Sequence, residues 1–215
     1  MKTDRSKVRR IPKRGLYDPE SIYSILDKEF ICQVGFVHQD HPVVIPTIYG
    51  RKDDMLYFHG ANVSRMLKNM ESGVLLSINV TRTNALVLAR SAFHHSLNYE
   101  SVTLFGTAVL VEDEKEKIES LKIISDQVLE DRWDEVRAPN QKELNVTKVL
   151  KFKISEGSAK IRNEGVGDDK EDYSLDIWAG LLPIERSYGF AENDARLKPG
   201  IEISRSVENM HGKKF

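Results

Sequence analysis

The sequence has a single cysteine, Cys32, which lies in an apolar stretch. No disulfide can therefore form within the chain, and no cluster of cysteine ligands can hold a metal. Long apolar runs are also missing, since none approaches the roughly 18 residues of a membrane-spanning helix. The charged amino-terminal residues are not followed by the apolar segment of a secretory signal. We therefore expect a cytoplasmic protein without a membrane partner.

An excess of either charge is absent too. The 215 residues include 32 Lys and Arg and 33 Asp and Glu, which gives a net charge of −1. Because proteins that bind nucleic acids usually carry a basic surface, this balance argues against a nucleic-acid partner. The first fourteen residues are a local exception, with seven basic side chains and one acid, Asp4. This basic N-terminal segment, residues 1–16, is either a solvated terminus or a site for phosphate or nucleic acid.

The apolar pattern predicts mainly β structure. Short segments rich in β-branched and aromatic residues alternate with turns, at 30–37, 43–49, 55–59, 73–81, 85–89, 102–110, 149–154 and 159–161. Helical spacing or helix-start residues occur at 18–29, 62–70, 112–133 and 140–146. A parallel α/β fold would need a helix between most strands, so we expect an antiparallel barrel with accessory helices.

The segment from Tyr57 to Arg65 is the strongest candidate for a binding motif. A short strand ends at a glycine turn, Gly60, and a helix capped by Asn62 is expected to follow. Backbone amides at the helix start, the Ser64 hydroxyl and the Arg65 guanidinium would converge there and suit a phosphate. The alternative is an ordinary capped helix with a surface arginine.

The adjacent histidines His94 and His95 do not predict a metal site. On a strand they would point to opposite faces, and no third ligand stands at a recognisable spacing. A serine nucleophile at Ser96 would need a strained elbow such as Gly-x-Ser-x-Gly, which is absent. We therefore expect no metal, and we expect this loop to shape a substrate pocket or a dimer contact.

Several motifs resemble the pyridoxamine 5′-phosphate oxidases. The segment 59–65 is similar to the family segment in which a Tyr-Thr pair precedes Ser-Arg-Lys at the phosphate of flavin mononucleotide (FMN). The nitroimidazole-resistance (NimA-like) branch shows similar motifs in the same order, here at 45–51, 57–60, 93–99, 101–106 and 178–180. The resemblance implies a mainly β, six-stranded antiparallel split β-barrel with accessory helices, formed by residues 17–184. An extended C-terminal tail, residues 185–215, would follow.

The resemblance also implies which residues bind the phosphate end of FMN. Ser64 and Arg65 match the phosphate-binding pair, while Met66 replaces the lysine of the family. His59 and Gly60 occupy the places of the Tyr-Thr pair beside the cofactor. His59 is also the candidate catalytic residue, because an imidazole can donate to a flavin, transfer protons or ligate haem iron. A structural role for His59 is an equal alternative.

The ring end of the cofactor is assigned in the same way. Thr47 and Tyr49 lie on the strand that runs along the flavin ring in the family, and Tyr99 belongs to the motif at 93–99. Ser101 stands where the oxidases use Gln to contact the flavin. Trp178 stands where a tryptophan of the partner subunit covers the site, so the resemblance implies a homodimer.

Two functions remain open at this point. The first is an FMN-dependent oxidoreductase that acts on a small aromatic or heterocyclic substrate. The second is a non-catalytic flavin or haem binding protein, which would be a carrier, sensor or scavenger; haem would then replace flavin. The oxidases hold pyridoxal phosphate with an Arg-Leu-His segment. The corresponding residues of this sequence are Ile184-Glu185-Arg186, which argues against oxidation of pyridoxamine phosphate.

Overall fold

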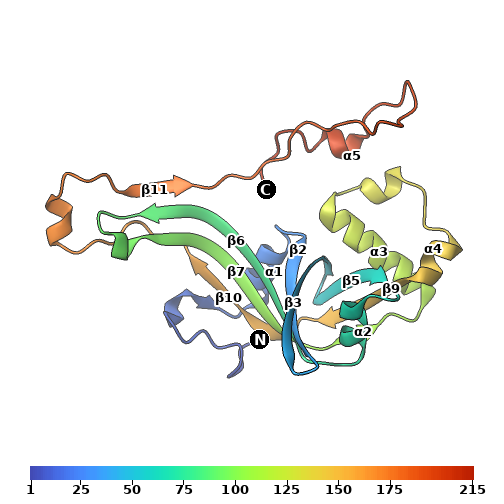
Figure 1. Ribbon diagram of the computed structural model, residues 1–215, viewed down its shortest axis with the longest axis horizontal. Helices are drawn as coiled ribbons and strands as arrows, with labels where there is room; N and C mark the ends of the chain where they lie inside the picture. The colour runs from blue at the N-terminus through green and yellow to red at the C-terminus, as the bar shows by residue number, and fades with distance from the viewer.

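Two antiparallel sheets dominate the computed structural model, which describes residues 1 to 215 (Figure 1). The larger sheet contains, in order of pairing, β1 (Gly15–Leu16), β10 (Glu156–Arg162), β7 (Ser96–Gly106), β6 (Leu76–Leu88), β2 (Ile31–His38) and β3 (His41–Ile48), and β11 (Gly180–Pro183) pairs with β6. The smaller sheet contains β4 (Gly50–Lys52), β5 (Met55–Ala61), β9 (Thr147–Lys153) and β8 (Ala108–Leu110). The predicted class, mainly β and antiparallel with accessory helices, is confirmed. The eleven strands exceed the predicted six partly because four of them have only two to four residues.

Side-chain caps explain where the helices begin. The helices are α1 (Pro19–Leu26), α2 (Arg65–Glu71), α3 (Glu114–Val128), α4 (Gln141–Val146) and α5 (Arg205–Glu208). Asp18, Asp113 and Asn140 each accept a hydrogen bond from the first turn that follows. The expected cap Asn62 is wrong: Ser64 caps α2, because the Asn62 side chain donates to the carbonyl of Asn145 instead. None of the five helices has the length and apolar composition to cross a bilayer.

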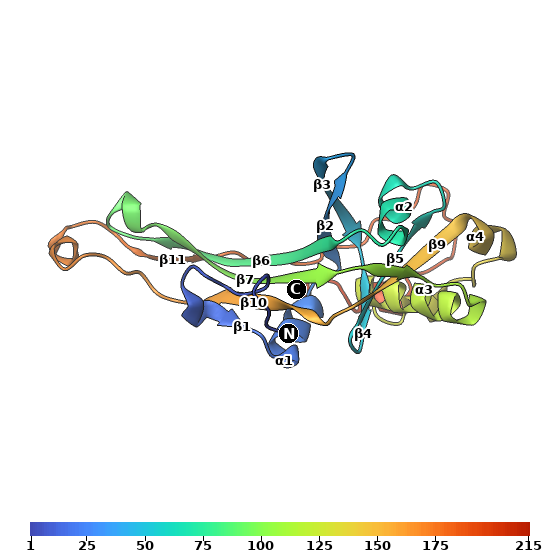
Figure 2. The ribbon, with the colours of Figure 1, turned by 90° about the horizontal axis from the view of Figure 1, so that it is seen from below.

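The longest strand pair extends beyond the rest of the sheet. The sequence predicted separate strands at 73–81 and 85–89, but the structure has one strand, β6, with a bulge between Thr83 and Ala85. The outer parts of β6 and β7, the loop 163–179 and β11 together project from one end of the molecule (Figures 1 and 2). We call this projection, residues 83–98 and 163–184, the arm.

The basic N-terminal segment packs along β10. The amide of Gly157 donates to the carbonyl of Met1 over 3.1 Å, and Arg5 forms an ion pair with Glu156. Strand β1, at the end of the segment, pairs with β10. These contacts hold the segment against β10 while most of its charged side chains stay exposed, and its role stays a prediction.

The C-terminal tail returns from the arm to the opposite end of the molecule, over α3 (Figure 1). Arg186 pairs with the buried carboxylate of Glu29, and Arg132 donates to the hydroxyl of Ser204 over 2.6 Å. Hydrogen bonds from Ser206 lower the pKa of Glu135 to about 2. The tail is extended apart from α5, and it is fixed at these points.

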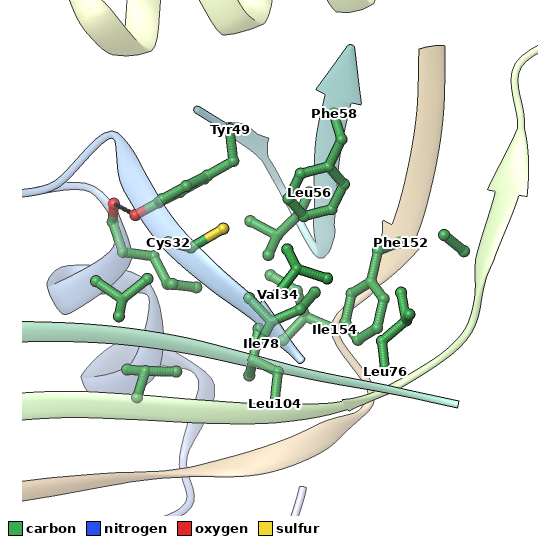
Figure 3. Close-up of a cluster of buried hydrophobic side chains, with 14 of the residues drawn as sticks. Cys32, Val34, Tyr49, Leu56, Phe58, Leu76, Ile78, Leu104, Phe152 and Ile154 are labelled. Carbon is green, nitrogen blue, oxygen red and sulfur yellow. Dashed lines mark hydrogen bonds between the residues drawn. The ribbon is translucent and has the colours of Figure 1, made fainter. Parts of the chain in front are cut away.

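The hydrophobic core lies between the two sheets (Figure 3). Cys32 and Ile78 from the larger sheet meet Leu56, Phe58 and Phe152 from the smaller one, and all five are fully buried. Burial raises the pKa of the Cys32 thiol to about 12, so this thiol is not a nucleophile near neutral pH.

Helix α3 approaches the smaller sheet very closely at Gly50. A Cβ atom at this position would lie 2.7 Å from the backbone of Ile124. Since backbone cannot move aside as a flexible side chain can, only glycine permits this approach.

We predict that Gly50→Ala destabilises the protein by about 1–3 kcal/mol through overpacking. The free energy of unfolding in urea measures the effect. Gly189→Ala is the control, because a Cβ atom there meets no atom within 4 Å. Equal stability of the two variants would contradict the close approach of α3.

Candidate functional site

His59 lies on the face of β5 that α3 covers. Gly50 faces α3 and is paired with Tyr57, and residues opposite each other in an antiparallel pair share one face. Alternation along β5 then places His59 on the same face as Tyr57. Its own partner across the sheet, Val149, is fully buried. His59 is thus half-buried between the smaller sheet and its helical cover.

The imidazole of His59 is held in its neutral form. Burial lowers its pKa, because the charged ring loses hydration. The Nδ1 atom is enclosed and has no hydrogen-bond partner within the chain. Buried polar atoms are usually satisfied, so an unsatisfied imidazole nitrogen is a candidate for binding a ligand or a metal ion.

The predicted phosphate motif forms a turn followed by α2. The Ser64 hydroxyl accepts a hydrogen bond from the amide of Leu67 over 3.5 Å, and the exposed Arg65 guanidinium has no acidic partner within the chain. Gly60 faces the core, where a Cβ atom would approach the Leu67 side chain to 3.0 Å. Met66 is buried in the core, so its side chain is not available to a phosphate. Because α2 has only seven residues, the charge of Arg65 is the main attraction for an anion here.

The residues predicted along the flavin ring have different environments. The Tyr49 hydroxyl donates to the carbonyl of Leu26 over 2.6 Å, and burial raises the pKa of this phenol. Tyr49 is fully buried and therefore has no side-chain atom free for a ligand. Thr47 is half-buried near the end of β3.

The remaining predicted residues lie toward the arm. Tyr99 and Ser101 are half-buried on β7, where the Ser101 hydroxyl donates to the carbonyl of Lys160 over 3.4 Å. Trp178 lies two residues before β11 and is 67% exposed. The arm and α2 lie at opposite ends of the molecule (Figures 1 and 2). One chain therefore does not bring Trp178 to Ser64 and Arg65, and a site that uses all of them needs a second subunit.

A polar row on the outer face of the larger sheet was missed from the sequence. Asn79 donates to the hydroxyl of Thr103 over 3.1 Å and accepts from Thr81 over 2.8 Å, and Ser101 lies on the same face. Exposed apolar side chains continue this face on β2 and β3: Ile31, Val37, Val44 and Ile48. Polar groups beside apolar ones suit a flat heterocycle. The signal in the sequence was the alternation of polar and apolar residues along β6.

The reasoning about His94 needs correction. His94 lies at the end of a short 3₁₀ turn, Ala92–His94, and not on a strand. Its Nε2 atom lies 3.2 Å from a carboxylate oxygen of Asp169, and one ligand atom of Asp172 completes a group within 4.8 Å. The expected strand position was therefore wrong, and the arm brings distant acids to His94 although the sequence shows no recognisable ligand spacing. The absence of a metal stays a prediction.

Comparison with known families identifies the chain. A family model described as pyridoxamine 5′-phosphate oxidase matches residues 18–161. The chain belongs to this family. A comparison of the chain with curated proteins finds no significant match.

Solved structures of similar proteins also match parts of the chain outside residues 18–161. The flavocytochrome Anf3 from Azotobacter vinelandii is 33% identical, with a TM-score of 0.91 over 97% of each chain. The FAD and haem binding protein from Mycobacterium smegmatis is 31% identical, with a TM-score of 0.89 over 93% of this chain and 98% of that one. A protein described as a 5-nitroimidazole antibiotic resistance protein, from Bacteroides thetaiotaomicron, shares the fold at 22% identity, with a TM-score of 0.59 over 80% of this chain and 90% of that one.

We predict that His59 titrates below 6.5, its ordinary pKa, when followed by NMR. Because the unfolded chain then takes up a proton more readily than the folded one, stability should decline as the pH falls below 6.5. His59→Gln should remove this part of the decline in urea unfolding. A midpoint at or above the ordinary value, or the same pH dependence in the variant, would contradict the buried neutral ring.

Proposed function

We propose that this chain is a flavin-dependent oxidoreductase that also binds haem and acts on a small aromatic or heterocyclic substrate in the cytoplasm. The likeness to two proteins described as a flavocytochrome and as an FAD and haem binding protein carries this proposal. It covers at least 93% of the chain and thus includes segments outside the family model. The comparison favours FAD over the FMN expected from the sequence, and haem beside the flavin rather than in its place.

Arg65 is the residue best suited to the flavin phosphate. Its guanidinium is exposed, has no acidic partner, and directly follows the Ser64 hydroxyl. A charge-assisted contact of this kind is among the stronger polar interactions, and a guanidinium matches two phosphate oxygens. The polar row beside exposed apolar side chains on the larger sheet suits the ring of the same cofactor.

His59 is the residue best suited to haem iron. An imidazole nitrogen is one of the established protein ligands to haem iron. The imidazole of His59 has a lowered pKa and an unsatisfied Nδ1 atom. When bound, the flavin would supply hydride transfer and the haem one-electron chemistry. The role of the chain is then to bind and orient these groups and to keep His59 unprotonated.

The absorbance spectrum of the purified protein tests this function. We expect the bands of oxidised flavin together with a sharp haem band, and mass spectrometry of the released flavin should give FAD. Bleaching of the flavin by NAD(P)H would distinguish an oxidoreductase from a carrier, sensor or scavenger. A colourless protein that takes up neither group when they are supplied would overturn the proposal.

Two variants localise the cofactors in the same experiment. Arg65→Ala should weaken flavin binding roughly tenfold to a hundredfold, the usual loss for one charge-assisted contact. Lys68→Ala, on the next turn of α2 and also exposed, is its control and should retain flavin. His59→Ala should lose the haem band and keep the flavin. Equal flavin occupancy in the Arg65 and Lys68 variants would contradict the phosphate assignment.

We further propose that the protein is a homodimer. The arm exposes large apolar side chains without a core of its own, among them Trp178 at 67%, Leu182 at 52% and Ile177 at 49%. Contiguous apolar surface of this kind usually marks an interface. A partner subunit that covers the arm would also bring its own Trp178 toward Ser64 and Arg65, as the family resemblance implies.

Sedimentation equilibrium should therefore give twice the chain mass of 24.6 kDa. Trp178→Ala should lower flavin affinity and leave the helix content by circular dichroism unchanged, because the indole is exposed within one chain. Phe190→Ala removes an exposed aromatic side chain of the C-terminal tail, outside the arm, and is the control for flavin affinity. A monomer that retains its flavin would contradict the shared site.

A further inference from the structure

A pocket of about 600 Å³ lies where the basic N-terminal segment meets β10 and the arm. Its lining includes four basic side chains, Arg10, Arg14, Lys160 and Arg162. His95 and the aromatic ring of Tyr99 lie beside them. We call it the basic pocket. The proposed flavin and haem sites make no use of its cations or of the N-terminal segment.

The charges in the basic pocket are not balanced within the chain. Glu164 is the one acid in the lining, and it already pairs with Arg14 and, at 3.6 Å, with Lys13. Arg10 and Lys160 have no acidic partner. Two uncompensated positive charges thus face one cavity in a protein whose net charge is −1. Such a concentration of charge attracts an anion.

The floor of the basic pocket is preorganised. Arg162 is buried, and its guanidinium donates to the side-chain oxygen of Asn98 and, over 3.2 Å, to the carbonyl of Glu164. Asn98 also donates to that carbonyl over 3.0 Å and accepts from the Glu164 amide over 3.1 Å. This closed set of hydrogen bonds fixes the side chains of Arg162 and Asn98. A ligand would therefore need to order only the two outer cations.

We propose that the basic pocket binds the diphosphate group of a nucleotide. Guanidinium and ammonium groups with free donors are the usual partners of phosphate oxygens. The volume is that of an ordinary small-molecule site, and the rings of Tyr99 and the exposed Phe93 give the rim surfaces on which a base can stack. The diphosphate belongs either to a separate nucleotide or to a bound flavin dinucleotide. The second source rests on the proposed function and needs the proposed dimer, because one chain keeps Arg65 and the arm at opposite ends.

Calorimetric titration with pyrophosphate tests this site on the protein as purified and again after its flavin is removed. We expect a dissociation constant below about 1 mM, with ADP binding more tightly than pyrophosphate because its base adds stacking. Arg10→Ala and Lys160→Ala should each weaken binding roughly tenfold. Lys7→Ala is the matched control, since Lys7 is an exposed cation of the same segment outside the pocket. Arg10 is exposed, so its removal leaves the fold intact.

The outcomes separate the two sources of the diphosphate. Binding before and after flavin removal assigns the pocket to a separate nucleotide, whereas binding only after removal assigns it to the dinucleotide part of the flavin. No binding to either form, or the same loss in Lys7→Ala as in Arg10→Ala, would overturn the site. If the purified protein holds no flavin, the proposed function fails, but the titration with pyrophosphate still shows whether the pocket binds a diphosphate. The two proposals can therefore fail independently.

Discussion

The pairing of β6 with β7 is the constraint on which the rest of the structure depends. It runs from Leu76 opposite Gly106 to Val87 opposite Ser96. Its inner half contributes Ile78 and Leu104 to the core, whereas its other face carries the polar row. Its outer half extends past the core and supports β11 and the loop that reaches His94. A single ladder thus joins the core, the outer face and the arm.

Cations without an acidic partner lie beside a candidate binding feature at two separate places on this frame. Arg65 lies beside α2, and Arg10 with Lys160 faces the basic pocket toward the arm. Some neighbouring cations pair with acids, as Lys148 does with Glu71 and Arg14 with Glu164. In our proposals, Arg65, Arg10 and Lys160 mark where anionic groups bind. His59 is different, because its burial keeps it neutral and favours coordination or hydrogen bonding over ion pairing.

Local signals predicted much of the fold, and long-range contacts explain what was missed. The capping residues Asp18 and Asn140 located their helices, since a cap acts within one turn. The continuity of β6 was missed because polar residues around Asn84 imitate a turn, and only pairing with β7 keeps them extended. Asp169 reaches His94 across 75 residues, which no spacing rule anticipates. The candidate site was found through motif likeness, whereas burial of Tyr49 and Met66 depends on packing that the sequence does not reveal.

Strand β3 forms one edge of the larger sheet and contains Pro42 and Pro46. The amide of Tyr49 donates to the carbonyl of Phe30, next to β2, so the amides of even-numbered residues in β3 point outward. Proline has no amide hydrogen, and two of the four outward donors between residues 42 and 48 are therefore missing. This edge is consequently a poor template for adding another strand, which protects the sheet from edge-to-edge aggregation even though its outer face is partly apolar.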